Sequence, residues 1–239
     1  MNGAKTARNA VAVILAAGSG ERYGNALPKQ FLYLSGRSLL HYSLAEFSQV
    51  KHIGEIVLVV PRDFRERAER ICARGAFAKI GRIVNGGRTR QESSWLGVRG
   101  IREDDRPVLI HDAARPLVSA RLILACLAAM AEHEAVCVAV PACDTIFQVD
   151  KNGIVDAIPE RRSLVHAQTP QGFRVGLIRE AHERARREKF FGASDDCSLI
   201  LRYALADVHT VPGEARNRKI TTAADMEFAA HILRSRTKN

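Results

Sequence analysis

One stretch near the start of the chain places the strongest constraint on the fold. Residues 11–17 form a short, continuous apolar run, VAVILAA, and glycines follow at positions 18, 20 and 24. A short apolar run that ends at glycines is typical of a strand buried on both faces of a parallel sheet. The glycines permit positive φ and let backbone N–H groups approach a ligand closely, which favours an anion.

Two cations flank this glycine-rich loop. Arg22 lies within it, and Lys29 follows Pro28, whose ring restricts the backbone beside the lysine. The glycine spacing is one residue too long for the dinucleotide-binding fingerprint, and no Gly-Lys-Ser/Thr follows as in a P-loop. Glycines alone would be compatible with a surface turn, but the Pro28-Lys29-Gln30 segment favours a triphosphate site.

The first 140 residues alternate between strand and helix patterns. Apolar runs predict strands at 55–60, 80–84, 107–110 and 135–140, and amphipathic segments predict helices at 39–50, 64–74, 91–101 and 117–132. This order predicts an α/β protein with a Rossmann-like, open, mostly parallel sheet and helices on both faces. A length of 239 residues is enough for one large core, so we expect a single domain over residues 1–239.

The strand–helix order breaks after residue 141. Segments 144–149 and 154–158, joined by a turn that ends at Gly153, predict a β-hairpin. We interpret about residues 142–166 as an arm that projects from the sheet. Helices are predicted again at 175–189, 195–204 and 222–233, with a strand at 208–211.

Composition narrows the possible partners. The net charge of +10 is compatible with nucleic acid, a membrane surface or anionic small substrates. Its densest run, residues 182–189, mixes both signs at helical spacing without aromatic residues, which favours a solvated helix face. No apolar run approaches the roughly 18 residues of a membrane span, and residues 1–9 do not resemble a signal peptide. We therefore expect anionic substrates, with no nucleic acid and no membrane.

The five cysteines are odd in number and contain no C-x-x-C pair. This pattern favours free thiols in a reducing cytoplasm and disfavours a zinc site.

Polar segments follow the predicted strands, where open α/β sheets bind their ligands. They are residues 18–29, 86–93, 111–116, 144–145, 161, 168–171, 194–196 and 217–221. Arginine, lysine and small hydroxyl residues dominate them, and no Ser-His-Asp order or metal-ligand spacing stands out. Each also has an ordinary structural interpretation; Asp112, for example, could cap a helix or pair with Arg115.

Together these motifs resemble a known family. Ala16-Ala17-Gly18-x-Gly20-x-Arg22, Pro28-Lys29-Gln30, HDAARP at 111–116 and N-x-K-I-T at 217–221 are similar to the sugar-nucleotide pyrophosphorylase superfamily. More narrowly, they resemble the 2-C-methyl-D-erythritol 4-phosphate cytidylyltransferases of non-mevalonate isoprenoid synthesis. The resemblance extends from residue 11 to residue 233.

Two alternatives remain open. A sister family makes CDP-ribitol from ribitol 5-phosphate, and residues 158–161, 22–25 and 194–197 are more similar to that family. A non-catalytic nucleotide- or RNA-binding module is the third possibility, which the presence of both Arg22 and Lys29 disfavours.

The resemblance implies roles for individual residues. The implied catalytic residues are Arg22 and Lys29, which stabilise the transition state, and Arg161 and Lys219, which position the substrate phosphate. The implied nucleotide contacts are Leu15, Ala16, Ala17, Gly18, Ser19, Gly20, Gly86, Gly87, Ser93 and Asp112. The implied contacts to the polyol phosphate are Asp112, Arg115, Thr145, Arg161, Thr169 and Lys219. The resemblance also implies a homodimer formed through the arm. The implied reaction calls for Mg²⁺ held mainly by the phosphates of CTP, with few protein ligands, and the sequence assigns no residue as a metal ligand.

Overall fold

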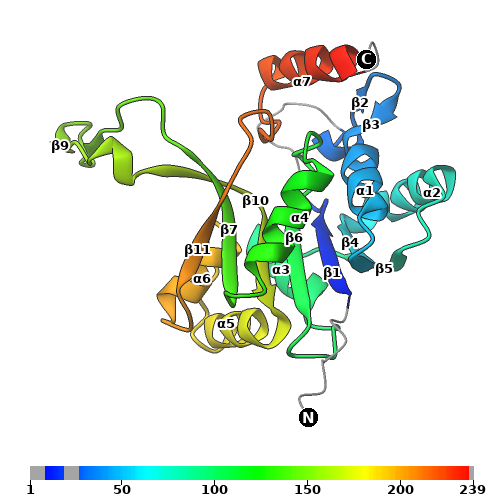
Figure 1. Cartoon of the computed structure of the whole chain (residues 1–239), viewed down its shortest axis with the longest axis horizontal. Coiled ribbons are helices and arrows are strands. Elements are labelled where there is room, and N and C mark those ends of the chain that lie inside the picture. Colours follow the sequence, from blue (N-terminus) through cyan, green and yellow to red (C-terminus); the bar gives the residue numbers. More distant parts are fainter. Residues whose placement is uncertain (1–8, 19–26, 237–239) are drawn as a thin grey trace.

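The computed structural model describes residues 9–18 and 27–236, and its centre is a seven-stranded sheet (Figure 1). The strand order is β11-β7-β10-β6-β1-β4-β5. Their bounds are β1 (Ala10–Leu15), β4 (Ile53–Val60), β5 (Ile80–Asn85), β6 (Pro107–Asp112), β7 (Ala135–Pro141), β10 (Val165–Arg174) and β11 (Val208–Pro212). All neighbours run parallel except β10, which is antiparallel to both β6 and β7. The predicted fold class is confirmed.

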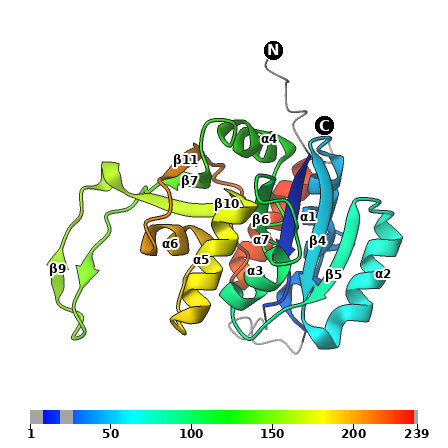
Figure 2. The same ribbon diagram turned by 90° about the horizontal axis from the view of Figure 1, so that it is seen from below.

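Helices cover both faces of the sheet (Figure 2). One face packs against α1 (Leu39–Gln49), α2 (Arg65–Gly75) and α4 (Ala120–Ala129), and the other against α3 (Arg90–Val98), α5 (Val175–Arg187) and α6 (Asp196–Arg202). Strand β1 contributes Ala12 and Ile14 to the first core and Val11 and Val13 to the second. All of its residues are buried, which explains why its sequence is apolar throughout rather than alternating.

Hydroxyl or carboxylate side chains cap the N-termini of most helices. Ser38, Thr89, Ser119 and Asp195 cap α1, α3, α4 and α6 by accepting a hydrogen bond from a backbone N–H three residues on. The helix predicted from residue 117 therefore begins only at residue 120. The sequence pattern also suggests Asp63 as the cap of the helix predicted at 64–74, but this is wrong: a 3₁₀ turn, η3 (Arg62–Phe64), precedes α2, and no side chain caps that helix.

Strand β10 and a small hairpin near the N-terminus of α1 were not predicted. Strand β10 contains the polar segment 168–171, which interrupts the apolar alternation of a strand and coincides with a shift of register against β7. A small hairpin of β2 (Tyr33–Leu34) and β3 (Arg37–Ser38) turns through Ser35 and Gly36, both at positive φ. Helix α7 (Ala223–Arg236) packs near this hairpin, with Leu34, Ile220 and Ala229 in their shared core.

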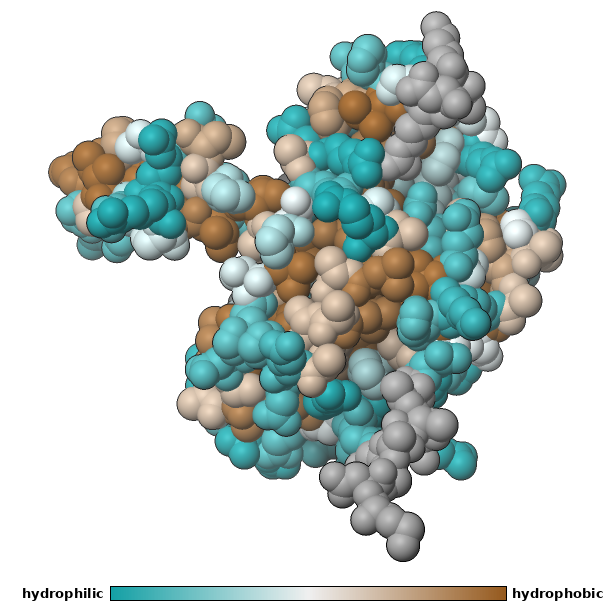
Figure 3. All heavy atoms as spheres, viewed as in Figure 1, coloured by the Kyte–Doolittle hydropathy of each residue, from teal (hydrophilic) through white to brown (hydrophobic). Residues whose placement is uncertain are grey.

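The predicted hairpin projects from the body of the molecule beyond β7 (Figure 1). Strands β8 (Gln148–Val149) and β9 (Val155–Ala157) pair antiparallel, and Gly153 adopts φ +83° in the turn. The carboxylate of Asp150 holds the turn by accepting from the backbone N–H groups of Asn152 and Ile154. Large apolar side chains are exposed along this arm, as Figure 3 shows: Ile146, Phe147, Val149, Ile154, Val155, Ile158 and Val165.

Within residues 9–18 and 27–236, no helix has the length and apolar content needed to cross a membrane. All five cysteines are free thiols, and Cys126, Cys137 and Cys197 are buried.

Candidate active site

The loop after β1 is held by a side chain from the predicted Pro28-Lys29-Gln30 clamp. Gln30 is buried in the short helix η2 (Lys29–Phe31) and donates from Nε2 to the carbonyl oxygens of Ala16 (2.5 Å) and Gly18 (3.0 Å). These bonds bring half-buried Lys29 next to the start of the glycine-rich loop. The predicted contacts Ser19, Gly20 and Arg22 lie outside the described residues.

The turn between β5 and α3 lies beside this loop. A Cβ on Gly86 would stand 2.2 Å from the Cβ of Ala17, so only glycine permits the observed approach. The Ser93 hydroxyl accepts from the backbone N–H of Gly87 (3.1 Å) and donates to the carbonyl of Thr89 (2.9 Å). Ser93 therefore shapes the turn, and the predicted nucleotide contacts at 15–18 and 86–87 lie at one edge of the sheet.

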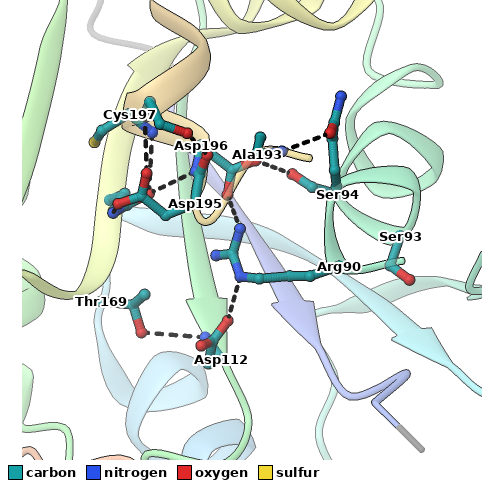
Figure 4. Close-up of polar contacts among 12 residues, drawn as sticks. Arg90, Ser93, Ser94, Asp112, Thr169, Ala193, Asp195, Asp196 and Cys197 are labelled. Atoms are coloured by element: carbon teal, nitrogen blue, oxygen red, sulfur yellow. Dashed lines mark hydrogen bonds and ion pairs between the residues drawn. The ribbon is translucent and has the colours of Figure 1, made fainter. Parts of the chain in front are cut away.

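Asp112, the last residue of β6, lies between two cations. Its Oδ1 accepts from Nε of Arg90 (3.1 Å), and its Oδ2 accepts from Nζ of Lys219 (2.6 Å), as Figure 4 shows for Arg90. Burial would raise the pKa of Asp112, but the charges of Arg90 and Lys219 outweigh it and hold that pKa far below its usual range. Asp112 is therefore ionised at neutral pH, and its partners are not the Arg115 that sequence proximity suggested.

Arg115 instead joins two segments that are distant in sequence. Its guanidinium donates to the carbonyl oxygens of Asn217 (2.9 Å) and Ala167 (3.2 Å). In turn, Asn217 donates from Nδ2 to the carbonyl of Thr169 (2.8 Å), and the N–H of Ile220 donates to Ala114 (2.8 Å). These bonds fix the segment that carries Lys219 over the end of β6.

Thr169 is buried beside Asp112, and its partner His111 was not predicted as part of the site. The Thr169 hydroxyl accepts from the N–H of Asp112 (3.1 Å) and lies 2.9 Å from Nδ1 of His111, whose Nε2 is 3.3 Å from the carbonyl of Arg115. A carbonyl only accepts, so Nε2 of His111 carries the proton and Nδ1 accepts from Thr169. Burial lowers the pKa of His111 to about 4, which keeps this ring neutral.

We expect His111 to make the protein less stable in weak acid. Its pKa is 6.5 when unperturbed and about 4 in the folded chain, so between these values the unfolded chain binds the proton more tightly. The stabilisation is complete above about pH 6.5 and is lost as the pH falls towards 4. From pH 7 to pH 5 the free energy of unfolding should drop by about 2 kcal/mol through this residue.

Urea denaturation at both pH values measures this effect. The His111→Asn variant should show a drop smaller by that amount, whereas His52→Asn, at an exposed histidine, should show the wild-type drop. An equal drop in all three proteins would contradict the assignment.

Two predicted substrate contacts lie elsewhere in the chain. Thr145 is exposed on the arm, and Arg161 begins the exposed turn η4 (Arg161–Ser163) and donates to the carbonyl of Cys143 (3.3 Å). The arm points away from the edge of the sheet that carries Asp112 (Figure 1). One chain thus brings together Asp112, Arg115, Thr169 and Lys219, and does not add Thr145 and Arg161 to them.

The sequence assigned no role to Arg90 or Asp196, yet both belong to the polar network around Asp112. Nη1 of Arg90 donates to Oδ2 of Asp196 (2.8 Å), and Asp196 is almost fully buried at the start of α6 (Figure 4). Both residues lie within polar segments that the sequence analysis identified, 86–93 and 194–196, and this was the available signal. Their pairing joins positions 106 residues apart and was not predictable from spacing.

The described residues contain no group of three or more His, Cys, Asp or Glu side chains arranged to hold a metal ion. Asp112 is the carboxylate at the centre of the site, and both of its oxygens already accept from cations. This donor set fits a Mg²⁺ ion whose ligands are mostly phosphate oxygens and water, the usual arrangement in nucleotide-dependent enzymes.

The two glycine turns lie at the same edge of the sheet as the buried carboxylate of Asp112 and its partner Lys219, an arrangement that suits a nucleotidyltransferase. Comparison with known proteins narrows the class, because residues 10–235 match the family described as 2-C-methyl-D-erythritol 4-phosphate cytidylyltransferase. The chain belongs to this family.

Relatives with that name match along nearly their whole length. The protein from Thermobifida fusca is 43% identical over 231 residues, which cover 94% of this chain and 93% of the relative. A solved structure from Anaerococcus prevotii, titled 4-diphosphocytidyl-2C-methyl-D-erythritol synthase, has a TM-score of 0.84 at 31% identity and covers 95% of this chain and 97% of that one. A relative from Haemophilus influenzae, the bifunctional ribulose 5-phosphate reductase/CDP-ribitol pyrophosphorylase Bcs1, is 34% identical over 95% of this chain, which spans 48% of that protein.

Proposed function

We propose that the chain joins CTP and 2-C-methyl-D-erythritol 4-phosphate into the CDP-polyol and releases pyrophosphate. The observation that carries this proposal is the Asp112–Lys219 pair at the same sheet edge as the two glycine turns. That edge offers backbone N–H groups for a nucleotide and a lysine for a second phosphate. Membership of the family supports both substrates.

The reaction needs little covalent chemistry from the protein. A phosphate oxygen of the polyol phosphate attacks the α-phosphorus of CTP in line, the new P–O bond forms, and the bond to pyrophosphate breaks. The nucleophile is already an anion, so no general base is required, and the neutral His111 is not needed as one. Catalysis consists of positioning two anions and stabilising the charge of the transition state, by Arg22 and Lys29 on the nucleotide and by Lys219 on the polyol phosphate.

A divalent cation completes this charge balance. We propose Mg²⁺, bound mainly by the phosphates of CTP and by water, because both oxygens of Asp112 already accept from cations of this chain. When bound, the ion neutralises phosphate charge. The protein contributes the backbone of the glycine turns and the fixed cations around Asp112.

We further propose that the chain is one nucleotidyltransferase domain and acts as a homodimer in the cytoplasm, with the arm crossing to the second copy. A run of exposed apolar side chains is unusual on a protein that stays monomeric, and it lies here on a projecting hairpin. The same arm carries Thr145 and Arg161, and it projects from the body of its own chain (Figure 1). Free cysteines support a reducing compartment.

Ribitol 5-phosphate is the second candidate substrate, and the Haemophilus relative is the observation in its favour. Pyrophosphate release with CTP and a panel of polyol phosphates separates the two. We expect the highest kcat/KM with 2-C-methyl-D-erythritol 4-phosphate. A higher value with ribitol 5-phosphate would reassign the substrate and leave the nucleotidyl transfer intact.

We expect CTP to be preferred over purine nucleotides. A Cβ on Gly86 would stand 2.2 Å from the Cβ of Ala17, so the two glycine turns meet closely at this edge. We propose that backbone groups of these turns bind the pyrimidine edge of the base and exclude a purine by size. In competition assays at fixed polyol phosphate, ATP and GTP should inhibit weakly and give little product. Equal turnover with CTP, ATP and GTP would reject this assignment.

A further inference from the structure

A row of four alternating charges leads from the protein interior to the proposed site. Asp196 binds Nη1 of Arg90 (2.8 Å), Nε of Arg90 binds Asp112 (3.1 Å), and Asp112 binds Nζ of Lys219 (2.6 Å). Figure 4 shows the first three members, with the guanidinium of Arg90 placed between the two carboxylates. Lys219, the last member, is the cation that meets the polyol phosphate in the proposed reaction, whereas Arg90 and Asp196 have no role in that reaction apart from this row.

The inner end of the row is rigid. Asp196 accepts from Oγ of Ser94 on α3 (2.5 Å), and Nε2 of His182 on α5 lies 3.4 Å from the same oxygen. All three side chains are buried. His182 belongs to the run 182–189 that the sequence indicated as a solvated helix face, and at this residue that interpretation is wrong.

The outer end is less constrained. The side chain of Lys219 is 34% exposed, against 10% for Asp112 and 1% for Asp196. Asp112 offers two oxygens, and Arg90 takes Oδ1, so a single oxygen remains for Lys219. The orientation of the Asp112 carboxylate thus depends on Arg90, and the position of the Lys219 ammonium depends on Asp112.

We propose that Arg90 is a positioning residue: it fixes the Asp112 carboxylate and thereby aims the Lys219 ammonium at the phosphate of the polyol substrate. The proposal rests on the proposed function, in which Lys219 is the cation that meets that phosphate. Without Arg90, the carboxylate could turn both oxygens to Lys219 and withdraw its ammonium from the substrate.

The chemistry of arginine is required for this role. Its planar guanidinium binds one carboxylate through Nε and a second through Nη1, in a fixed relative orientation. A lysine carries one compact ammonium group and cannot reproduce that geometry. The two carboxylates also outweigh the effect of burial and raise the pKa of Arg90 above its usual value, so its charge is permanent.

Removing Arg90 alone would leave two buried carboxylates and could prevent folding. The double variant Arg90→Met/Asp196→Asn avoids this, because it removes one positive and one negative charge and leaves the Asp112–Lys219 pair. We expect it to be more stable than Arg90→Met. Its kcat/KM for the polyol phosphate should nevertheless stay about 10²-fold below wild type, the effect expected for displacement of about 1 Å, with the CTP affinity from calorimetry little changed.

Arg90→Lys is the second test, because it keeps the charge and should fold. We expect the same selective loss of kcat/KM for the polyol phosphate. Arg106 provides a matched control: it also lies between two carboxylates, Glu55 (3.3 Å) and Glu103 (3.7 Å), but at the opposite end of β6. Arg106→Met should lower stability and leave kcat and both KM values at the wild-type level.

Each outcome decides the proposal. Wild-type kinetics in either Arg90→Lys or the double variant would show that Arg90 only neutralises buried carboxylates. An equal loss of CTP and polyol phosphate binding would also overturn the role. The wild-type protein in the same assay tests the proposed function separately. If it binds CTP yet releases no pyrophosphate with the polyol phosphate, both proposals fail. If the wild-type protein turns over normally and the Arg90 variants match it, only the role of Arg90 is rejected.

Discussion

Replacing Lys29 with alanine should lower kcat roughly 10³-fold, the effect of removing a cation aimed at a transferring phosphoryl group. CTP affinity should fall much less, because part of the contribution of the cation arises only as charge develops in the transition state. Gln30, the next residue, binds the carbonyl oxygens of Ala16 and Gly18 and so keeps Lys29 beside the nucleotide loop. Arg22→Ala should behave in the same way, since the resemblance assigns both cations to one task.

Single-turnover kinetics and calorimetry with CTP measure the two quantities separately. Lys79 offers a control, because it is also half-buried but lies just before the start of β5, at the end of the sheet opposite the site. Its ammonium donates to the carbonyl of Val50. Lys79→Ala should retain wild-type kcat. A Lys29→Ala variant with near-normal kcat and only a raised KM for CTP would show that Lys29 merely binds the nucleotide.

Two inactive variants should restore activity when they are mixed. Suppose that the arm of one copy brings Arg161 to the site of the other. A heterodimer of one Lys29→Ala chain and one Arg161→Ala chain then has one site with both defects and one site with none. Random association of the two variants in equal amounts should therefore recover about one quarter of wild-type activity. The physical basis is the position of Arg161 on an arm that projects from the body of its own chain (Figure 1).

The two variants are refolded or coexpressed together and compared with each variant alone. Pairing Arg161→Ala with Lys219→Ala should give the same recovery, whereas Lys29→Ala with Lys219→Ala should give none, because both side chains act within one chain. No recovery in any pair would place Arg161 in its own chain's site or outside catalysis. Sedimentation of a chain that lacks residues 144–158 should show a monomer, and a fully active monomer would overturn the dimer proposal.

The sequence alone determined the layers of the fold and the edge at which the site lies. Local patterns are sufficient for this: an apolar run such as 11–17 indicates a strand buried on both faces, and glycines mark the turns at its end. Because parallel strands end at the same edge, the polar residues that follow them could be expected to meet, as Asp112 and Lys219 do. The predicted arm also forms a hairpin, because its turn residues act over a few positions.

Only the tertiary structure decided which polar side chains are partners. Asp112 has Arg115 three residues away in sequence, yet it pairs with Arg90 and Lys219, while Arg115 binds carbonyl groups of distant segments. Strand β10 forms through pairing with β6 and β7 on either side, although its polar centre gives no strand pattern. Such contacts depend on the packing of helices and strands far apart in the chain. The role of Arg90 follows from its burial between two carboxylates. One of them, Asp196, is 106 residues away in sequence, and no local sequence pattern indicates that the two side chains are close in space.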